Sequence, residues 1–364
     1  MKRVVVIGAG PAGAAAAMRL TRCRNVDVQL LDRAAFPRRK VCGSGLSPWA
    51  LELLDEMGLG PAVRKEAHPI RCGLLVGAGG QRVELRAGYE AAVLLRERFD
   101  TILAHEAARR GANLREGVRV DGIVRQGERV VGVRTSEGDL DADAVIVTNG
   151  ANSTLAPAER PGKTLHSIMG WYEGVADVGN AVELYFDPVV KPYYGWVFPE
   201  SSQRVNIGIC YAPQPGSLNA RQRFEAFLER HLAGRLKYAT RLDRLVGFPI
   251  ATTSRPTALV EPGTLVAGEA AQLVDPLTAE GIHHALASGD QAGRVMGRIL
   301  EQNEEPTRLR LAPYTREVRR RIGRRLQASQ IFLHLAKTPA LDMVLRFGSL
   351  RPTQSFLSWV LAGA

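Results

Sequence analysis

Residues 4–13 read VVVIGAGPAG, and this stretch decides the fold of the chain. The apolar run 4–7 fits a buried strand, and the alanine-rich stretch 14–20 after the glycines favours a helix. A second apolar run, 26–31, is followed directly by Asp32. The order of strand, glycine turn, helix, strand and carboxylate predicts a Rossmann-like α/β unit.

The glycines of this turn have separate tasks. Gly8 allows a tight turn off the strand, Gly10 lets a pyrophosphate approach the backbone, and Gly13 lets the helix pack closely. The N–H groups and the positive dipole end of the helix then face the phosphates. Asp32 follows Gly13 by nineteen residues, where a carboxylate can accept hydrogen bonds from ribose hydroxyls. The stretch therefore predicts a dinucleotide site.

Two other interpretations of the N-terminus are a plain alanine-rich helix and a signal peptide whose charged region is Lys2-Arg3. The h-region of a signal peptide would not carry three glycines at this spacing, and it would not continue into a second strand. Both interpretations are therefore weaker than the dinucleotide site.

The composition indicates a globular protein with a sizeable core, since the 364 residues are 45% hydrophobic and 23% charged. The 48 Lys and Arg exceed the 37 Asp and Glu, but the excess is scattered and does not alternate with aromatic residues. This pattern favours a basic surface for phosphate-bearing or acidic partners and argues against nucleic acid. The four cysteines lack CxxC and metal-ligand spacing, which predicts reduced thiols, a cytoplasmic protein and no metal site.

The texture of the sequence changes along the chain. Residues 165–248 hold most of the aromatics, alternate like strands and include an amphipathic helix at 220–232, so they predict an antiparallel-sheet domain. The strand at 264–268 then returns to the first domain. The expected domains are a discontinuous cofactor domain at 1–164 and 249–305 with a small insertion near 65–95, a substrate domain at 165–248, and a helical tail at 306–364.

The end of the tail, residues 356–361, predicts a packed helix, with a membrane-surface foot as the alternative. The foot would give the protein a peripheral membrane contact. No apolar run reaches the ~18 to 20 residues that a membrane span needs.

Separated motifs resemble those of the flavoprotein group that includes para-hydroxybenzoate hydroxylase, the flavin-dependent halogenases and, most closely, the geranylgeranyl reductases. They are GAGPAG at 8–13, KVCGSG at 40–45, RERFD at 96–100, YGWVFP at 194–199, GEAA at 268–271 and DPLTAEGI at 275–282. The resemblance implies FAD as the cofactor and covers most of the chain to about Leu300. A Rossmann-like FAD-binding domain with an interleaved antiparallel-sheet substrate domain and C-terminal helices is the expected fold.

The resemblance also implies which residues contact FAD. Asp32 would hold the adenosine ribose and Arg33 would lie along the adenine, while Arg96 would reach the ribityl–phosphate region. The alternative for Arg96 is a solvated arginine on a helix face. The full expected set is Gly8, Gly10, Ala12, Gly13, Asp32, Arg33, Cys42, Gly43, Gly45, Arg96, Val120, Glu269, Pro276, Gly281 and Ile282.

The stretch 269–282 has a chemical reason of its own. The helix that opens at Gly281-Ile282 would point N–H groups and a positive dipole at the N1 and O2 edge of a reduced flavin. Pro276 would stiffen the loop against the ring, and the alternative is a loop that only closes a sheet. Glu269 stands where the family usually has aspartate, so the fine geometry at the ribityl chain is open.

Cys42 is expected beside the isoalloxazine, with Gly43 and Gly45 letting its loop lie close, and not as a nucleophile. Tyr194 and Trp196 alternate with small residues, so on a strand they face one side together. The resemblance places that side on the substrate, and the alternative is aromatic core between sheet and helix.

The leading functional hypothesis is an FAD-dependent reductase that delivers hydride from flavin N5 to a carbon–carbon double bond of a prenyl or other apolar substrate. The rivals are a flavin-dependent monooxygenase or halogenase acting on an aromatic or carrier-bound substrate, and a flavoprotein with purely structural FAD. The electron donor is expected to be NAD(P)H or a reduced carrier. The sequence offers no residue that we assign as catalytic acid or base.

Overall fold

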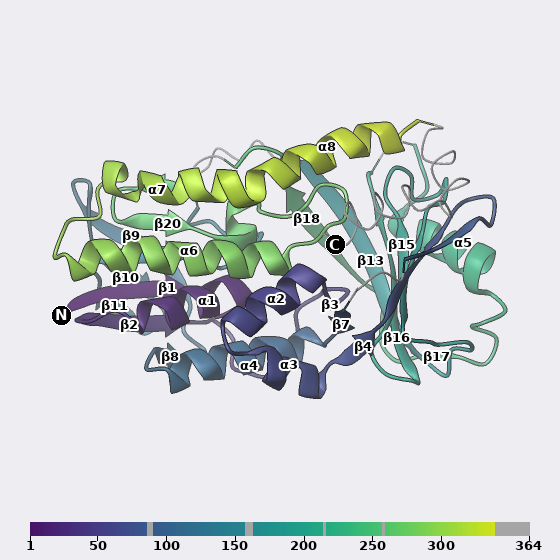
Figure 1. Cartoon of the computed structure of the whole chain (residues 1–364), viewed down its shortest axis with the longest axis horizontal. Coiled ribbons are helices and arrows are strands. Elements are labelled where there is room, and N and C mark those ends of the chain that lie inside the picture. The colour runs from purple at the N-terminus through teal and green to yellow at the C-terminus, as the bar shows by residue number, and fades with distance from the viewer. Residues whose placement is uncertain (86–89, 157–162, 214–215, 257–258, 339–364) are drawn as a thin grey trace. The chain divides into compact units, whose positions relative to one another are not determined.

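Figure 1 shows the computed structural model, which describes residues 1–85, 90–156, 163–213, 216–256 and 259–338. The described chain divides into two compact units. Unit 1 contains Met1–Arg39, Glu97–Lys163 and Ala251–Ala328, and unit 2 contains Lys40–Arg96, Thr164–Ile250 and the described residues from Ser329. The segment 356–361, expected as a packed helix or membrane foot, lies outside the described residues.

Unit 1 is built on a six-stranded sheet with the strand order β19-β20-β12-β1-β2-β8. Its strands are β1 (Lys2–Ile7), β2 (Val26–Leu31), β8 (Asn113–Arg115), β12 (Ala144–Val147), β19 (Val260–Glu261) and β20 (Thr264–Val266). All neighbours pair in parallel except β19, which pairs antiparallel at the edge. The expected return of the later apolar strands to the first sheet is therefore confirmed.

Helix α1 (Pro11–Leu20) packs directly against helix α6 (Ile282–Glu301) along its length (Figure 1). A Cβ atom on Gly289 would lie 2.0 Å from the carbonyl oxygen of Ala12, and one on Gly293 would lie 2.5 Å from that of Ala16. Small residues are needed at these contacts because the two backbones touch. The contacts advance together along both helices, so α1 and α6 run parallel.

The other helices of unit 1 are α4 (Arg96–Arg109) and α7 (Arg308–Val318). Helix α7 continues through a π turn (η2, Arg319–Gly323) into α8 (Arg324–Ala336), which belongs to unit 1 as far as Ala328. The hydroxyl of Tyr314 donates a hydrogen bond of 2.7 Å to the carbonyl oxygen of Val266, which fixes α7 on β20. The expected helical tail is confirmed as far as Ala336.

A small antiparallel sheet completes unit 1. Two of its strands, β9 (Val120–Gln126) and β10 (Arg129–Thr135), form an antiparallel hairpin. A third strand, β11 (Gly138–Asp141), joins β10 and was not expected.

Unit 2 is built on an eight-stranded sheet with the path β17-β13-β16-β15-β14-β5-β6 and with β18 paired to β13. Its strands are β5 (Cys72–Val76), β6 (Arg82–Leu85), β13 (Lys163–Glu173), β14 (Ala181–Tyr185), β15 (Gly195–Pro199), β16 (Arg204–Tyr211), β17 (Thr240–Arg241) and β18 (Val246–Thr252). The sheet is mostly antiparallel, as expected, but β5 pairs in parallel with β14. Residues 72–85 thus extend the large sheet of unit 2.

Unit 2 also contains helices α2 and α3 and a three-stranded sheet. Helix α2 (Pro48–Glu56) begins at Pro48 because the Ser47 hydroxyl caps it by accepting a hydrogen bond from the Ala50 N–H and Pro48 suits the first turn. Helix α3 (Gly60–Glu66) follows. The sheet has the order β3-β7-β4, formed by Gly45–Leu46, Ala91–Val93 and His68–Ile70.

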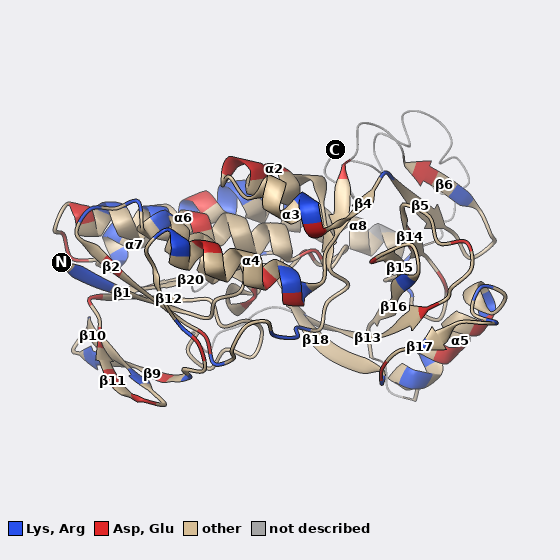
Figure 2. Ribbon diagram, turned by 90° about the horizontal axis from the view of Figure 1, so that it is seen from below, with Lys and Arg blue, Asp and Glu red and all other residues tan. Residues whose placement is uncertain are grey.

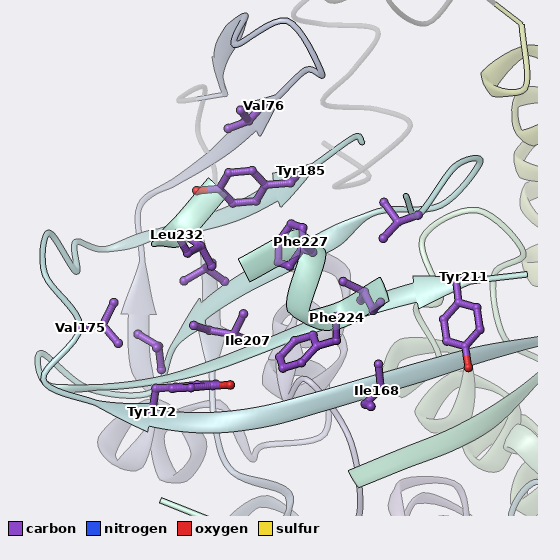
Figure 3. Packing of buried hydrophobic residues seen from close by; sticks show 14 residues of the cluster. Val76, Ile168, Tyr172, Val175, Tyr185, Ile207, Tyr211, Phe224, Phe227 and Leu232 are labelled. Carbon is purple, nitrogen blue, oxygen red and sulfur yellow. The ribbon is translucent and has the colours of Figure 1, made fainter. Parts of the chain in front are cut away.

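The core of unit 2 lies between one face of the large sheet and helix α5 (Ala220–Leu232). Figure 3 shows Phe224 and Phe227 of α5 among strand side chains that include Ile207 and Tyr172. Both phenylalanines are fully buried, so the expected amphipathic helix is confirmed. A capping box between Asn219 and Gln222 fixes the start of the helix.

Replacing Phe227 by alanine is expected to lower the free energy of unfolding by about 3 to 5 kcal/mol, because it leaves a cavity against Gly195 and the sheet. Urea unfolding measures the change. The matched control is Glu229→Ala on the exposed face of the same helix, which should shift the free energy by less than about 0.5 kcal/mol. Equal losses for the two variants would contradict this packing.

Lys and Arg residues are distributed over many helices and strands, often near Asp or Glu residues (Figure 2). On α4, for example, Glu106 pairs with Arg109 at 2.6 Å and with Arg110 at 2.7 Å. The scattered excess of basic residues expected from the sequence is visible in this arrangement. Across the described ranges, every helix is too short or too polar to cross a membrane.

Candidate functional site

The glycine turn after β1 leaves no room for side chains at its first and last glycines. Gly8 has φ of +97°, and a Cβ atom there would lie 2.9 Å from the Cα of Asn149. A Cβ atom on Gly13 would lie 1.8 Å from the carbonyl oxygen of Gly8, far inside any contact distance. The turn and the close approach expected of these two glycines are therefore present.

The middle glycine lies open at the start of α1. Gly10 is the N-cap of the helix, and no side chain caps it. The N–H groups of Ala12 and Gly13 have no acceptor within the helix, because the first turn of any helix leaves them unsatisfied. A Cβ atom on Gly10 would meet only the guanidinium of Arg38, 3.5 Å away. This is an arrangement that suits a phosphate group.

Asp32 directly follows β2 and is 6% exposed. One carboxylate oxygen accepts a hydrogen bond of 2.9 Å from the N–H of Ala9, and the other accepts one of 3.0 Å from Ala34. The carboxylate thus lies against the glycine turn, as the sequence predicts for a ribose-binding acid.

Arg38 was missed by the sequence analysis as a site residue. Its Nη1 lies 3.1 Å from the fully buried carboxylate of Asp100, and its Nη2 lies 3.5 Å from that of Asp32. Two carboxylates therefore hold a cation beside Gly10. The signal in the sequence was the basic run 38–40 together with the acid that ends the RERFD motif.

The residues expected at the adenine, Arg33 and Val120, and the one expected at the ribityl–phosphate region, Arg96, are placed less distinctively. Arg33 is exposed on the loop after β2, and Val120 is half-buried as the first residue of β9. Arg96 begins α4 and is only 9% exposed, so it is not the solvated arginine of the alternative interpretation.

The loop before α6 is a closed turn. One oxygen of Asp275 accepts hydrogen bonds of 2.9 Å from the N–H groups of Leu277 and Thr278, and the Asp275 N–H donates to the carbonyl oxygen of Glu280. Pro276 is buried within the turn. Gly281 is the N-cap of α6 and has no side-chain cap, so the helix presents free N–H groups there. Glu269 lies upstream, half-buried in the short helix Gly268–Ala271.

The two open helix ends, of α1 and α6, point the same way. Gly289 packs on Ala12, and α6 starts seven residues before Gly289 whereas α1 starts one residue before Ala12. The six-residue difference puts the start of α6 about 9 Å ahead of the start of α1, at 1.5 Å per residue. Two staggered positive helix ends suit a cofactor with charge at both its phosphates and its ring.

Charged and neutral groups meet behind the α6 loop. Arg325 Nη2 lies 2.9 Å from the Glu280 carboxylate, and its Nε lies 3.5 Å from the carboxylate of the buried Asp275. His283 and His284 lie beside them at the start of α6. Burial lowers the pKa of His283 to about 4 and also lowers the pKa of His284. Both imidazoles are therefore neutral at pH 7.

His283 should make the folded protein sensitive to acid. Its folded-state pKa of about 4 lies below the ordinary value of 6.5, so the unfolded chain binds more protons between these pH values and stability falls as the pH is lowered. His283→Gln should remove up to about 2 kcal/mol of the loss in unfolding free energy between pH 7 and pH 5. Urea unfolding at both pH values measures it, with His105→Gln at an exposed histidine as the control. An unchanged loss in His283→Gln would contradict the prediction.

In unit 2, Tyr194, Trp196 and Phe198 form an aromatic row on the sheet face opposite to α5. The rings of Tyr194 and Trp196 lie 6.3 Å apart, which confirms that they face one side together. The Trp196 indole donates a hydrogen bond of 2.7 Å to the side-chain oxygen of Asn206. A Cβ atom on Gly208 would lie 2.2 Å from the indole, so this glycine makes room for the ring. Trp196 is 5% exposed and rigidly held.

The loop of Cys42, Gly43 and Gly45 packs on this aromatic row. A Cβ atom on Gly43 would lie 3.3 Å from the indole nitrogen of Trp196, and one on Gly45 would lie 3.1 Å from the ring of Phe198. The sulfur of Cys42 accepts a hydrogen bond of 3.3 Å from the Ser44 N–H. The structure therefore brings the expected flavin-side loop and the expected substrate-side aromatics together within unit 2. Within the described ranges, no cluster of His, Cys, Asp and Glu could hold a metal ion.

The glycine turn on β1, the acid after β2 and the two open helix ends define a dinucleotide-binding flavoprotein. The family of FAD binding domains matches residues 1–329, and the chain belongs to this family. FAD is accordingly the cofactor. The residues around Gly10 fit its phosphates, since they offer N–H groups, a cation and an open backbone.

Similar proteins indicate which kind of FAD-dependent protein this chain resembles. Menaquinone reductase of Mycobacterium tuberculosis is 32% identical over 329 residues, 80% of this chain and 76% of the relative. Digeranylgeranylglycerophospholipid reductase 1 of Methanopyrus kandleri is 31% identical over 317 residues, 83% of this chain and 82% of the relative. A geranylgeranyl bacteriochlorophyll reductase-like protein from Thermoplasma acidophilum shares the fold with a TM-score of 0.87 at 22% identity, over 99% of this chain and 96% of that chain. The expected likeness to the geranylgeranyl reductases and the assignment as an FAD-dependent oxidoreductase are confirmed.

Proposed function

We propose that this protein saturates carbon–carbon double bonds in the isoprenoid chain of a lipid or quinone. The observation that carries the proposal is the identity of 31 to 32% with two reductases named for a menaquinone and a digeranylgeranyl lipid. Both substrates contain isoprenoid chains. The buried aromatic row of unit 2 supports the proposal, because a flat apolar surface suits such a chain.

When bound, FAD in its reduced form would supply hydride to one alkene carbon, the other carbon would take a proton from solvent, and the flavin would be left oxidised. The chain supplies binding and orientation. Gly8, Gly10, Gly13 and Ala12 form the phosphate turn with Arg38 as counter-charge, and Asp32 holds the ribose. Arg33, Arg96 and Val120 belong to the adenine and ribityl contacts of this proposal.

The start of α6 and the preceding loop serve the flavin ring in this proposal. The N–H groups at Gly281 and Ile282 stabilise negative charge that develops on the ring, and Glu269 and Pro276 border it. Cys42, Gly43 and Gly45 form the loop on the ring side. Tyr194 and Trp196 orient the isoprenoid chain.

The electron donor in this proposal is NAD(P)H or a reduced carrier. We assign FAD binding to residues 1–164 and 249–305, and substrate binding to residues 165–248. Because isoprenoid lipids reside in bilayers, the protein would work in the cytoplasm with a peripheral contact to the membrane.

Product analysis tests the proposal. The FAD-loaded protein is incubated without oxygen with a chemical reductant and either menaquinone or a digeranylgeranyl lipid, and the lipid is analysed by mass spectrometry. A mass gain of about 2 Da for each reduced double bond is expected, with none when FAD is removed. Unchanged lipid masses with both substrates would contradict it.

A further inference from the structure

Helix α8 contacts, through Arg325, the 275–280 loop that we assign to the flavin. We propose that Arg325 of α8 is a positioning residue that holds the 275–280 loop and the start of α6 against FAD. The inference rests on the proposed FAD contacts of this loop and does not depend on which substrate is reduced.

The first observation is a double ion pair that ties both ends of the turn. Arg325 Nη2 lies 2.9 Å from the Glu280 carboxylate at the end of the turn, and its Nε lies 3.5 Å from the Asp275 carboxylate at the start. The arginine side chain is 12% exposed, while Glu280 is 14% exposed and Asp275 is fully buried. Ion pairs this sheltered from water are not weakened like surface pairs.

The second observation is the conformation of the turn. Ala279, just before Glu280, has φ of +55°, a left-handed conformation that is uncommon for a residue with a side chain. Strain of this kind persists where surrounding contacts hold the backbone. Asp275 holds one side through two backbone N–H groups, and Arg325 holds both carboxylates from outside.

The third observation is charge balance. Two carboxylates face the start of α6, and the adjacent His283 and His284 are neutral because burial lowers the pKa of each. Arg325 therefore contributes positive charge that offsets the carboxylates at this helix end. Its loss would make the surroundings of the N–H groups that are to stabilise a reduced flavin more negative.

The fourth observation is how the helix delivers this residue. Arg325 is the second residue after the π turn Arg319–Gly323, where one wide turn changes the phase of the helix. Val318 just before the turn and Ile322 within it are buried, and Arg319 donates a hydrogen bond of 3.2 Å to the carbonyl oxygen of Pro256. π turns are rare in proteins, and those that occur are often found at functional sites.

The test compares Arg325→Gln, Arg325→Lys and the control Arg324→Gln, whose arginine is an exposed neighbour without an ion pair among the described residues. FAD dissociation constants are measured for the oxidised and reduced cofactor, and the midpoint potential is measured independently with a redox dye. Arg325→Gln should weaken oxidised FAD at least tenfold and reduced FAD tenfold more, which lowers the two-electron midpoint potential by about 30 mV. Lysine should give intermediate values, because one ammonium group cannot pair both carboxylates as a guanidinium fork does.

Several outcomes would overturn the proposal. A folded Arg325→Gln protein with unchanged FAD affinity and potential refutes it, and so does a loss of stability that leaves the potential unchanged, since that marks a structural role alone. If Arg325→Gln does not fold, Arg325→Lys decides, because its poorer pairing with the two carboxylates must weaken reduced FAD more than oxidised FAD. All readouts need only FAD binding, so failure of alkene reduction with normal FAD binding would refute the proposed function and leave this inference standing.

Discussion

Gly13→Ala is expected to weaken FAD binding at least 100-fold. The added Cβ would lie 1.8 Å from the Gly8 carbonyl oxygen and 2.7 Å from the Thr148 hydroxyl oxygen. Both neighbours are parts of the sheet and its turn, so α1 must move away. Overpacking of this kind costs about 1 to 3 kcal/mol, and the displaced helix end also loses its phosphate contacts. We expect the FAD dissociation constant to rise at least 100-fold, which is about 2.7 kcal/mol.

Fluorescence titration of the apoprotein with FAD measures this change. The matched control is Gly122→Ala in β9 of the same unit, where a Cβ atom meets nothing within 4 Å. Its FAD affinity should stay within about twofold of the native value. A Gly13→Ala protein that binds FAD as tightly as the control would show that α1 does not form the phosphate site.

Trp196→Ala is expected to lower kcat/KM for the isoprenoid substrate at least 100-fold, which is about 2.7 kcal/mol in the barrier. The substitution removes the central ring of the aromatic row and leaves the Asn206 amide without its indole partner. FAD affinity should change little if the row serves the substrate. Steady-state kinetics and FAD titration on the same preparation separate the two effects.

Gly208→Ala tests the same ring without removing it. Its Cβ would lie 2.2 Å from the indole and force the ring aside, so kcat/KM should fall here as well. Tyr238→Ala is the control, because this aromatic of unit 2 is 83% exposed. Full activity in both Trp196→Ala and Gly208→Ala would return the aromatic row to the alternative interpretation, a core without a substrate role.

Local patterns in the sequence predict most of the FAD-binding part of the site. The spacing of the glycines, the acid after the second strand and the start of α6 at Ile282 were all predictable, because each depends on residues close in the chain. The alternation of Tyr194 and Trp196 likewise fixed their common face.

Long-range pairings could not be predicted in the same way. Arg38 meets Asp100, Arg325 meets Glu280, and β5 pairs in parallel with β14. No period or spacing links such partners, because the fold as a whole brings them together. A charged residue in isolation is most often solvated, so the sequence gives little reason to single out Arg38 or Arg325.

The most direct test of alkene reduction is a single turnover without oxygen. The protein is reduced stoichiometrically and mixed with menaquinone or a digeranylgeranyl lipid. The return of the oxidised flavin absorbance is followed, the reaction is quenched, and the mass of the lipid is determined by mass spectrometry. We predict one saturated double bond for each flavin reoxidised, with no oxygen present. Flavin that stays reduced until oxygen is added, followed by hydroxylation or halogenation of an aromatic substrate, would contradict the reductase and establish the rival chemistry.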